Sequence, residues 1–126
     1  MNADDKVTKL FHLSGANMQS TADQQFSRIG AFTAYKISDI FAREISGGTT
    51  ISCVGGIYTS PAKGGNILVA AAQSWLGLTG AGKIVTSVLT ALVATDEQTA
   101  TPYLSLTTGS TGACIADLVI FGYQFS

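Results

Sequence analysis

The final quarter of the chain has the residue pattern of two β-strands, and this pattern constrains the fold more than any other. Residues 103–108 and 113–125 are two extended runs rich in β-branched and aromatic side chains. The turn-forming segment 109–112 (Gly-Ser-Thr-Gly) separates them. The pattern predicts a β-hairpin whose second strand ends close to residue 126.

Both faces of that second strand are apolar. Side chains alternate across a strand, so Leu118 and Ile120 point to one face and Val119 and Phe121 to the other. A strand that is apolar on both sides is typical of a sheet covered on both sides. We therefore expect one face to pack on the core and the other to pack against a neighbouring subunit.

Earlier segments carry similar strand patterns. We predict strands at 9–13, 33–45, 49–61 and 83–90, separated by glycine-rich turns. Within 33–45, alternation breaks at Asp39-Ile40, which indicates a β-bulge. The spacing of the apolar residues there also fits a helix, but the Gly47-Gly48 turn and the returning run after it favour a strand.

Helical signals are few. Residues 67–78 form the best helix candidate, because three consecutive alanines have high helix propensity and Leu68 and Trp75 share a helical face. A short helical turn at 21–25 within the polar stretch 17–28 is the second candidate.

These elements predict a mainly β fold. We expect a β-sandwich of the jelly-roll type, with six to eight short strands and at most one or two short helices. The polar segment 1–8 is expected to be a flexible arm, and residues 9–126 a single β domain.

Composition excludes several classes of function. Charged residues are 12% of the chain, about half the usual fraction. The surface is then either a neutral, Thr-rich β surface or one partly hidden in a homo-oligomer. The seven Lys and Arg residues are scattered and the net charge is −1, so we expect no nucleic-acid partner. The longest apolar run, 67–72, is too short for a membrane span, and the polar N-terminus does not resemble a signal peptide, so we expect synthesis in a cytoplasm.

No pattern of residues points to catalysis. The single histidine, His12, lies between Phe11 and Leu13, and alternation places it on the more exposed face of its strand, as a surface or interface residue. The acidic pairs Asp4-Asp5 and Asp96-Glu97 fit solvated loops rather than a cleft. We therefore expect no enzyme activity.

Cysteine usage favours buried thiols. Cys53 and Cys114 each lie in an apolar run, as small core residues do. The chain has one histidine and no closely spaced cysteine pair, so we expect no zinc site and no cofactor. The aromatic residues Trp75, Tyr58, Tyr103 and Tyr123 are either core and rim residues or a sugar-stacking surface.

The chain resembles the small structural proteins of tailed bacteriophages. The resemblance lies in residues 55–59, 63–65, 69–73, 99–108 and 116–122, together with the upstream segment 20–24. It implies a virion component, foremost a capsid decoration or cement protein that binds the major capsid protein. The alternative is a tail-fibre or tail-tip module that recognises a host-surface glycan. By analogy with decoration proteins, a trimer is favoured among homo-oligomers.

No functional residue carries over from the resemblance, because such proteins act by surface fit. The candidate interface residues are therefore those of the arm, the exposed strand face and the loops: Asp4, Asp5, Lys6, His12, Gly47, Gly48, Lys63, Asp96 and Glu97.

The two-faced C-terminal strand gives a testable prediction. Deletion of residues 118–126 should prevent soluble expression, because it removes apolar side chains from both faces of a strand in the sheet. The measurement is the soluble fraction after expression. A soluble, folded truncation would show that the strand is peripheral.

Overall fold

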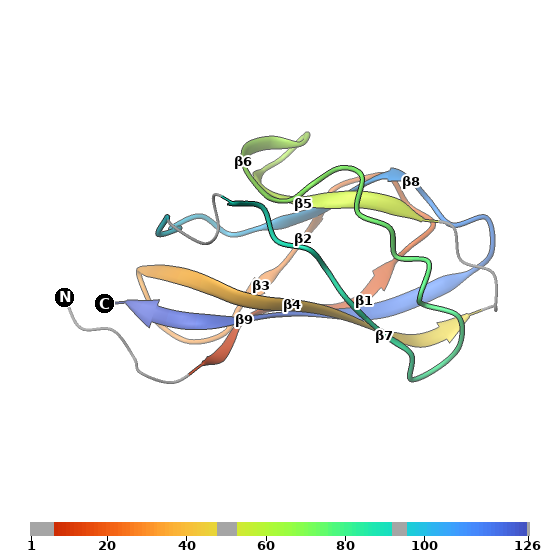
Figure 1. The fold of residues 1–126 in the computed structure, drawn as a ribbon, viewed down its shortest axis with the longest axis horizontal. Coiled ribbons are helices and arrows are strands. Elements are labelled where there is room, and N and C mark those ends of the chain that lie inside the picture. Colours follow the sequence, from red (N-terminus) through yellow and green to blue (C-terminus); the bar gives the residue numbers. More distant parts are fainter. Residues whose placement is uncertain (1–6, 48–52, 92–95, 126) are drawn as a thin grey trace.

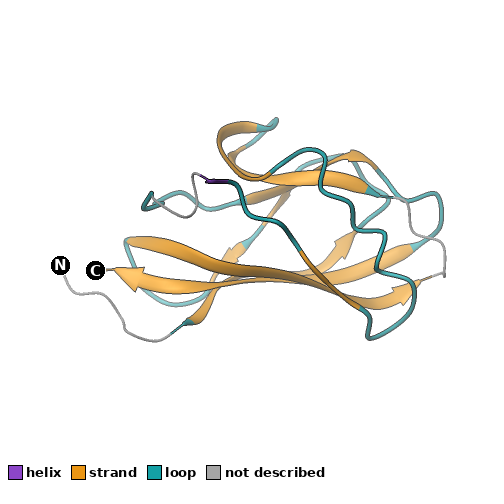
Figure 2. Cartoon of the chain, in the orientation of Figure 1, coloured by secondary structure: helices purple, strands orange, loops and turns teal. Residues whose placement is uncertain are grey.

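Two antiparallel sheets pack face to face in the computed structural model, which describes residues 7–47, 53–91 and 96–125 (Figures 1 and 2). One sheet has the strand order β3-β1-β9-β4-β7, and the other has the order β2-β8-β5-β6. The strands are β1 (Thr8–Asn17), β2 (Gln24–Gln25), β3 (Ser27–Arg28), β4 (Ala34–Gly47), β5 (Val54–Ser60), β6 (Gly64–Val69), β7 (Ile84–Thr86), β8 (Tyr103–Thr108) and β9 (Cys114–Phe125).

The pairing is that of a long hairpin rolled into two layers. Strand β1 pairs with β9, β2 with β8, β4 with β7, and β5 with β6. Lateral pairing of β9 with β4 and of β8 with β5 then completes the two sheets. This is the strand order of a jelly roll, and it confirms the predicted fold class. The described residues form nine strands rather than six to eight, because β2 and β3 lie in the stretch 17–28 that was predicted as a loop.

The long strands near the N-terminus agree with the sequence pattern. Strand β1 begins at Thr8, one residue inside the predicted arm 1–8. Strand β4 shows a register shift between Ile37 and Asp39 where it pairs with β9, which confirms the predicted bulge and excludes the helical alternative.

The predicted C-terminal hairpin is wrong. Strands β8 and β9 lie in opposite sheets, and segment 109–112 crosses between the layers. The crossing is held by a hydrogen bond from Ser110 N–H to the Met18 carbonyl oxygen (2.8 Å). The reason is packing: Leu106 of β8 and Leu118 of β9 both belong to the core, so the two strands face each other across it rather than lying edge to edge. The turn predicted after β4 likewise joins opposite sheets, although Gly48 and residues 49–52 fall outside the described residues.

The predicted helix at 67–78 is also wrong. Residues 64–69 form β6, residues 70–72 are exposed, and Ser74 bridges Val54 at the start of β5. The Gly55 N–H donates to the Gln73 carbonyl oxygen and the Trp75 N–H to the Cys53 carbonyl oxygen, both at 3.0 Å. Backbone pairing along the edge of β5 therefore outweighs the helix propensity of three alanines, which is worth less than about 1 kcal/mol per residue.

Two smaller expectations also change. The helical turn predicted at 21–25 is replaced in part by β2, and the strand predicted at 83–90 is only three residues long, as β7. Both segments lie at sheet edges, where a short strand still satisfies the neighbouring backbone.

The core fills the space between the sheets. Trp75 is fully buried, and its indole N–H donates to the Gly55 carbonyl oxygen (3.1 Å). Phe11 packs edge-on against Tyr35, with ring centroids 4.9 Å apart. The other large, fully buried side chains are Phe26, Leu10, Met18, Ile40, Ile57, Leu68, Leu78 and Leu104.

The turn between β5 and β6 has a strained backbone. Ala62 and Lys63 both have positive φ angles, 58° and 59°, which cost non-glycine residues roughly 1–2 kcal/mol each. Tertiary contacts hold the turn: the Ala62 N–H donates to Asp23 Oδ2 (2.8 Å), and Lys63 Nζ donates to Ser105 Oγ (3.0 Å). The Ala62 N–H and the Ser105 hydroxyl lower the pKa of the Asp23 carboxyl, with a smaller contribution from Lys63.

Substitution at Ala62 tests this strain. Ala62→Asn should raise the free energy of unfolding by up to about 1 kcal/mol, because asparagine tolerates a left-handed backbone better. Ala62→Val, the matched control, should lower it, because a β-branched side chain is poorly accommodated at positive φ. Chemical denaturation of the three proteins measures both effects, and equal stability of all three would show that the turn is relaxed.

Candidate interface on the outer face of the five-stranded sheet

Strand β9 lies at the centre of the five-stranded sheet and has one buried and one open face. Cys114, Ala116, Leu118 and Ile120 are fully buried and face the core. The alternate positions 115, 117, 119, 121 and 123 point outward and are half-buried. The alternation predicted for residues 118–121 is therefore confirmed. An outward face of this kind is normally polar, yet here it carries Val119 and Phe121.

Neighbouring strands continue this apolar surface. Val119 is paired in register with His12 of β1 and with Phe41 of β4. Phe41 also packs edge-on against Phe121, with ring centroids 5.7 Å apart. Ile84 on β7 borders the surface and is 61% exposed. We name this surface, formed by outward side chains of β1, β9, β4 and β7, the outer face.

Phe41 and Val119, paired across β4 and β9, form the apolar row of the outer face. Charged side chains lie on both sides of this row. On one side of the row, Asp117 of β9 is paired with Arg43 of β4. On the other side, Phe121 is paired with Lys9 of β1 and Asp39 of β4. Each side of the row therefore carries one acidic and one basic residue.

The cations of the outer face are unpartnered within the described structure. The side chains of Arg43 and Lys9 make no hydrogen bond or ion pair with any described residue, and both residues are exposed. The acids each have one local partner: Asp117 Oδ1 accepts from the Gly15 N–H (2.9 Å), and Asp39 Oδ2 from the Ser38 hydroxyl (2.6 Å).

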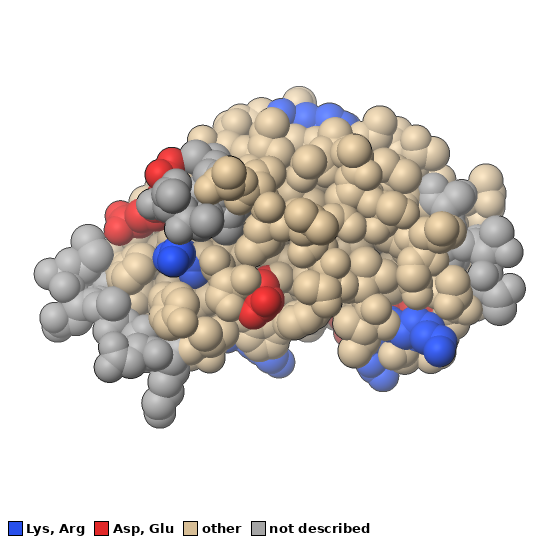
Figure 3. All heavy atoms as spheres, viewed as in Figure 1, with Lys and Arg blue, Asp and Glu red and all other residues tan. Residues whose placement is uncertain are grey.

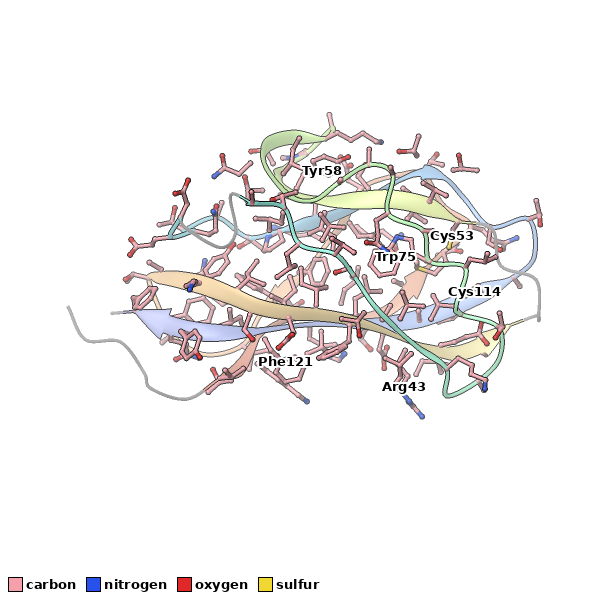
Figure 4. All side chains as sticks on the ribbon, in the orientation of Figure 1. Arg43, Cys53, Tyr58, Trp75, Cys114 and Phe121 are labelled. Carbon is pink, nitrogen blue, oxygen red and sulfur yellow. The ribbon has the colours of Figure 1, made fainter. Side chains whose placement is uncertain are left out.

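A shallow groove of about 460 Å³ crosses the outer face. Its floor is formed by Phe41, Val119 and Phe121, and charged side chains stand at its rim. Figure 4 shows Phe121 and Arg43 projecting from the five-stranded sheet, away from the other layer. An apolar floor with a charged rim is the composition of a protein–protein contact surface.

The predicted interface residues are distributed over the molecule rather than gathered. Only His12 lies on the outer face, where it lines the groove. Lys63 lies in the β5–β6 turn of the other sheet, and Gly47 ends β4 with no room for a Cβ atom, which would lie 2.3 Å from the Ala113 carbonyl oxygen. Asp4, Asp5, Lys6 and Gly48 fall outside the described residues.

Lys63 and the pair Asp96-Glu97 belong to two segments that contact each other at Asn66 and Gln98. Asp96 and Glu97 are exposed and precede Gln98, which is buried. Asn66 Nδ2, three residues after Lys63, donates to Gln98 Oε1 (2.9 Å), so the β5–β6 turn and the segment before β8 approach each other. This placement is separate from the outer face.

Sequence reasoning missed five residues that line the groove: Lys9, Phe41, Arg43, Ile84 and Asp117. Phe41 was expected only as part of an apolar strand. The available signal was the apolar second face of β9, but the neighbours of β9 depend on sheet order, which alternation does not reveal.

The proposed aromatic sugar-stacking surface is not formed. Trp75 is fully buried and Tyr58 is 3% exposed, so neither ring can stack on a ligand at the surface. Burial also raises the pKa of Tyr58. The core interpretation is correct for both, while Tyr103 and Tyr123 are half-buried on different sheets.

The two cysteines are free and buried, as predicted. Figure 4 shows both at the same end of the sandwich. Burial raises the pKa of Cys53 to about 11 and that of Cys114 to about 12. The Cys114 thiol donates to Glu44 Oε1 (3.4 Å), and this fully buried carboxyl was not anticipated from the sequence.

Comparison with known proteins adds no relative: neither a protein family, nor a curated protein, nor a solved structure matches the chain. Within the described ranges, no three His, Cys, Asp or Glu side chains are grouped so as to hold a metal ion. None of the described residues belongs to a helix long and apolar enough to cross a membrane.

Thiol accessibility gives a prediction about Cys53 and Cys114. Alkylation of the native protein should be slow at neutral pH and fast in denaturant, because only the thiolate reacts and both thiols are buried. Rapid labelling of the native protein at one equivalent or more would contradict their burial.

The pH dependence follows from the same pKa shifts. In the folded protein each thiol keeps its proton up to about pH 11–12, whereas in the unfolded chain it loses it near pH 8.5. The free energy of unfolding should therefore fall as pH rises through this window. A Cys53→Ala/Cys114→Ala variant should lose less stability across the window, measured by denaturation at each pH, and an equal loss in both proteins would exclude the thiols as its source.

Proposed function

We propose that this chain is a non-enzymatic structural protein of a bacteriophage virion, a capsid decoration protein that binds the major capsid lattice and stabilises the head. The observation that carries the proposal is the apolar outer face, which is built as a contact surface. On this proposal the protein is made in the host cytoplasm and resides in the virion as a homo-oligomer.

The outer face supports assembly rather than chemistry. Its groove is shallow, its floor is apolar, and the imidazole of His12 at its edge makes no hydrogen bond with the described residues. A broad apolar surface that excludes water instead suits a protein partner.

The fold supports a virion role by analogy. Jelly rolls occur in viral capsid proteins and in lectins, although a fold alone does not decide function. The resemblance of residues 20–123 to phage structural proteins favours the first of these groups. The glycan-binding alternative has lost its main support, because Trp75 and Tyr58 are buried.

The sparse charge of the surface fits a protein that works in many copies. Most of the surface seen in Figure 3 carries neither acidic nor basic side chains. When many copies bind one lattice, each contact can be weak and nearly neutral, because linked binding events reinforce one another.

A reconstitution experiment tests this function. Heads of the phage that encodes this chain, assembled without it, should bind the purified protein and release their DNA at a higher temperature after binding. Co-sedimentation measures binding, and nuclease access to the DNA during heating measures stability. Location of the protein on the tail, or the absence of any binding to heads, would contradict the proposal.

A further inference from the structure

The outer face is apolar, ordered and open within the described structure. We propose that a second copy of this chain covers it, forming a face-to-face dimer about a two-fold axis that crosses the strands at Phe41 and Val119. This inference rests on the proposal that the outer face is an assembly interface, and it names the partner.

Symmetry about the apolar row supports a second copy. On β4 the outward residues on either side of Phe41 are Arg43 and Asp39, one basic and one acidic. A two-fold axis along the row places β4 over β4 of the partner and reverses the strand direction. Arg43 of each copy then lies opposite Asp39 of the other, so two identical ion pairs form.

A second set of charges fits the same axis. On β9, the outward residues before and after Val119 are Asp117 and Phe121. Phe121 is paired with Lys9 of β1. After the rotation, Asp117 faces the Phe121 region of the second copy, within reach of the flexible Lys9 side chain. The unpartnered cations of one copy thus meet the acids of the other, which is the complementarity that sets register at interfaces.

The apolar row supplies the centre of the contact. Phe41 and Val119 of the two copies meet at the axis, and Phe121 and Ile84 extend the contact on either side. Stacked sheets pack about 10 Å apart with side chains interdigitated, and half-buried aromatic side chains are the common anchors of such contacts. A face that pairs with itself gives a closed dimer rather than the trimer implied by the resemblance.

The size of the face sets the expected affinity. Four strands about 4.8 Å apart and about seven residues at 3.3 Å each make a patch of roughly 15 by 20 Å. At about 300 Å² per copy, this patch is well below the roughly 800 Å² per partner of a standard interface, so the contact is a weak, transient one. We therefore expect a concentration-dependent dimer with a micromolar dissociation constant.

Sedimentation equilibrium of the purified full-length chain, from about 1 to 500 µM, tests the inference. The wild-type protein should pass from monomer to dimer over this range. Val119→Lys should weaken the dimer roughly tenfold or more, because it buries an unpaired charge at the axis. Thr107→Lys, at an exposed position on β8 of the other sheet, is the matched control and should leave the dimer unchanged. Circular dichroism and melting confirm that each variant is folded.

Charge exchange tests the axis itself. Arg43→Asp should weaken the dimer by placing two acids opposite each other, and the double variant Arg43→Asp/Asp39→Arg should restore it. Restoration by Arg43→Asp/Asp117→Arg instead would overturn this axis, because that exchange rescues a rotation about the strand direction.

The outcomes separate this inference from the proposed function. A monomer at all concentrations that still binds phage heads would overturn the dimer and leave the decoration role standing. A dimer that Val119→Lys disrupts, but that never binds heads, would support the dimer and overturn the role. A trimer, or a dimer unaffected by Val119→Lys, would also overturn the inference.

Discussion

The rest of the structure depends on the pairing of β9 between β1 and β4. This strand is hydrogen-bonded on both edges, to β1 over residues 115–122 and to β4 over residues 114–125. Its inward side chains help to fill the core, and the sheet admits no side chain at Gly122, where a Cβ atom would lie 2.0 Å from the Lys36 carbonyl oxygen. The N-terminal and C-terminal parts of the chain are therefore joined in one sheet, which closes the rolled hairpin.

The two sheets differ in how far other segments of the chain bury their strands. The central residues of β5 are all buried, whereas β9 alternates between buried and half-buried positions. Segments of the same chain crowd the sheet of β5: a Cβ atom on Gly56 would lie 2.2 Å from the Val69 carbonyl oxygen, and Lys63 reaches Ser105 of β8. Among the described residues, none covers the outward side chains of Val119 and Phe121 in this way, because both line the groove of the outer face.

The proposed interface on the outer face would give specificity to a chain with few charges. Exposed apolar area favours association with many partners, since the hydrophobic effect is non-directional. The four charges around Phe41 and Val119 restrict that choice, because a partner must place acids opposite Arg43 and Lys9 and bases opposite Asp39 and Asp117. The proposed second copy, in the inverted orientation, would meet both conditions with no further residues.

The sequence by itself determined the local features of this protein. Period-two alternation identified the two faces of residues 118–121, the break at Asp39-Ile40 identified the bulge in β4, and the apolar surroundings of Cys53 and Cys114 indicated their burial. Each of these depends on neighbours in the chain. The order of strands in the sheets does not depend on neighbours in the chain, and only the tertiary structure decided it. The turn 109–112 suits a hairpin as well as a crossing between layers. The core decides between them, because it takes Leu106 from one sheet and Leu118 from the other. The same holds at residues 70–75. There the backbone forms hydrogen bonds with Cys53 and Gly55 beside β5, instead of the bonds within the segment that a helix would form. The outer face is likewise a product of sheet order, because Phe41 meets Val119 only where β4 lies beside β9.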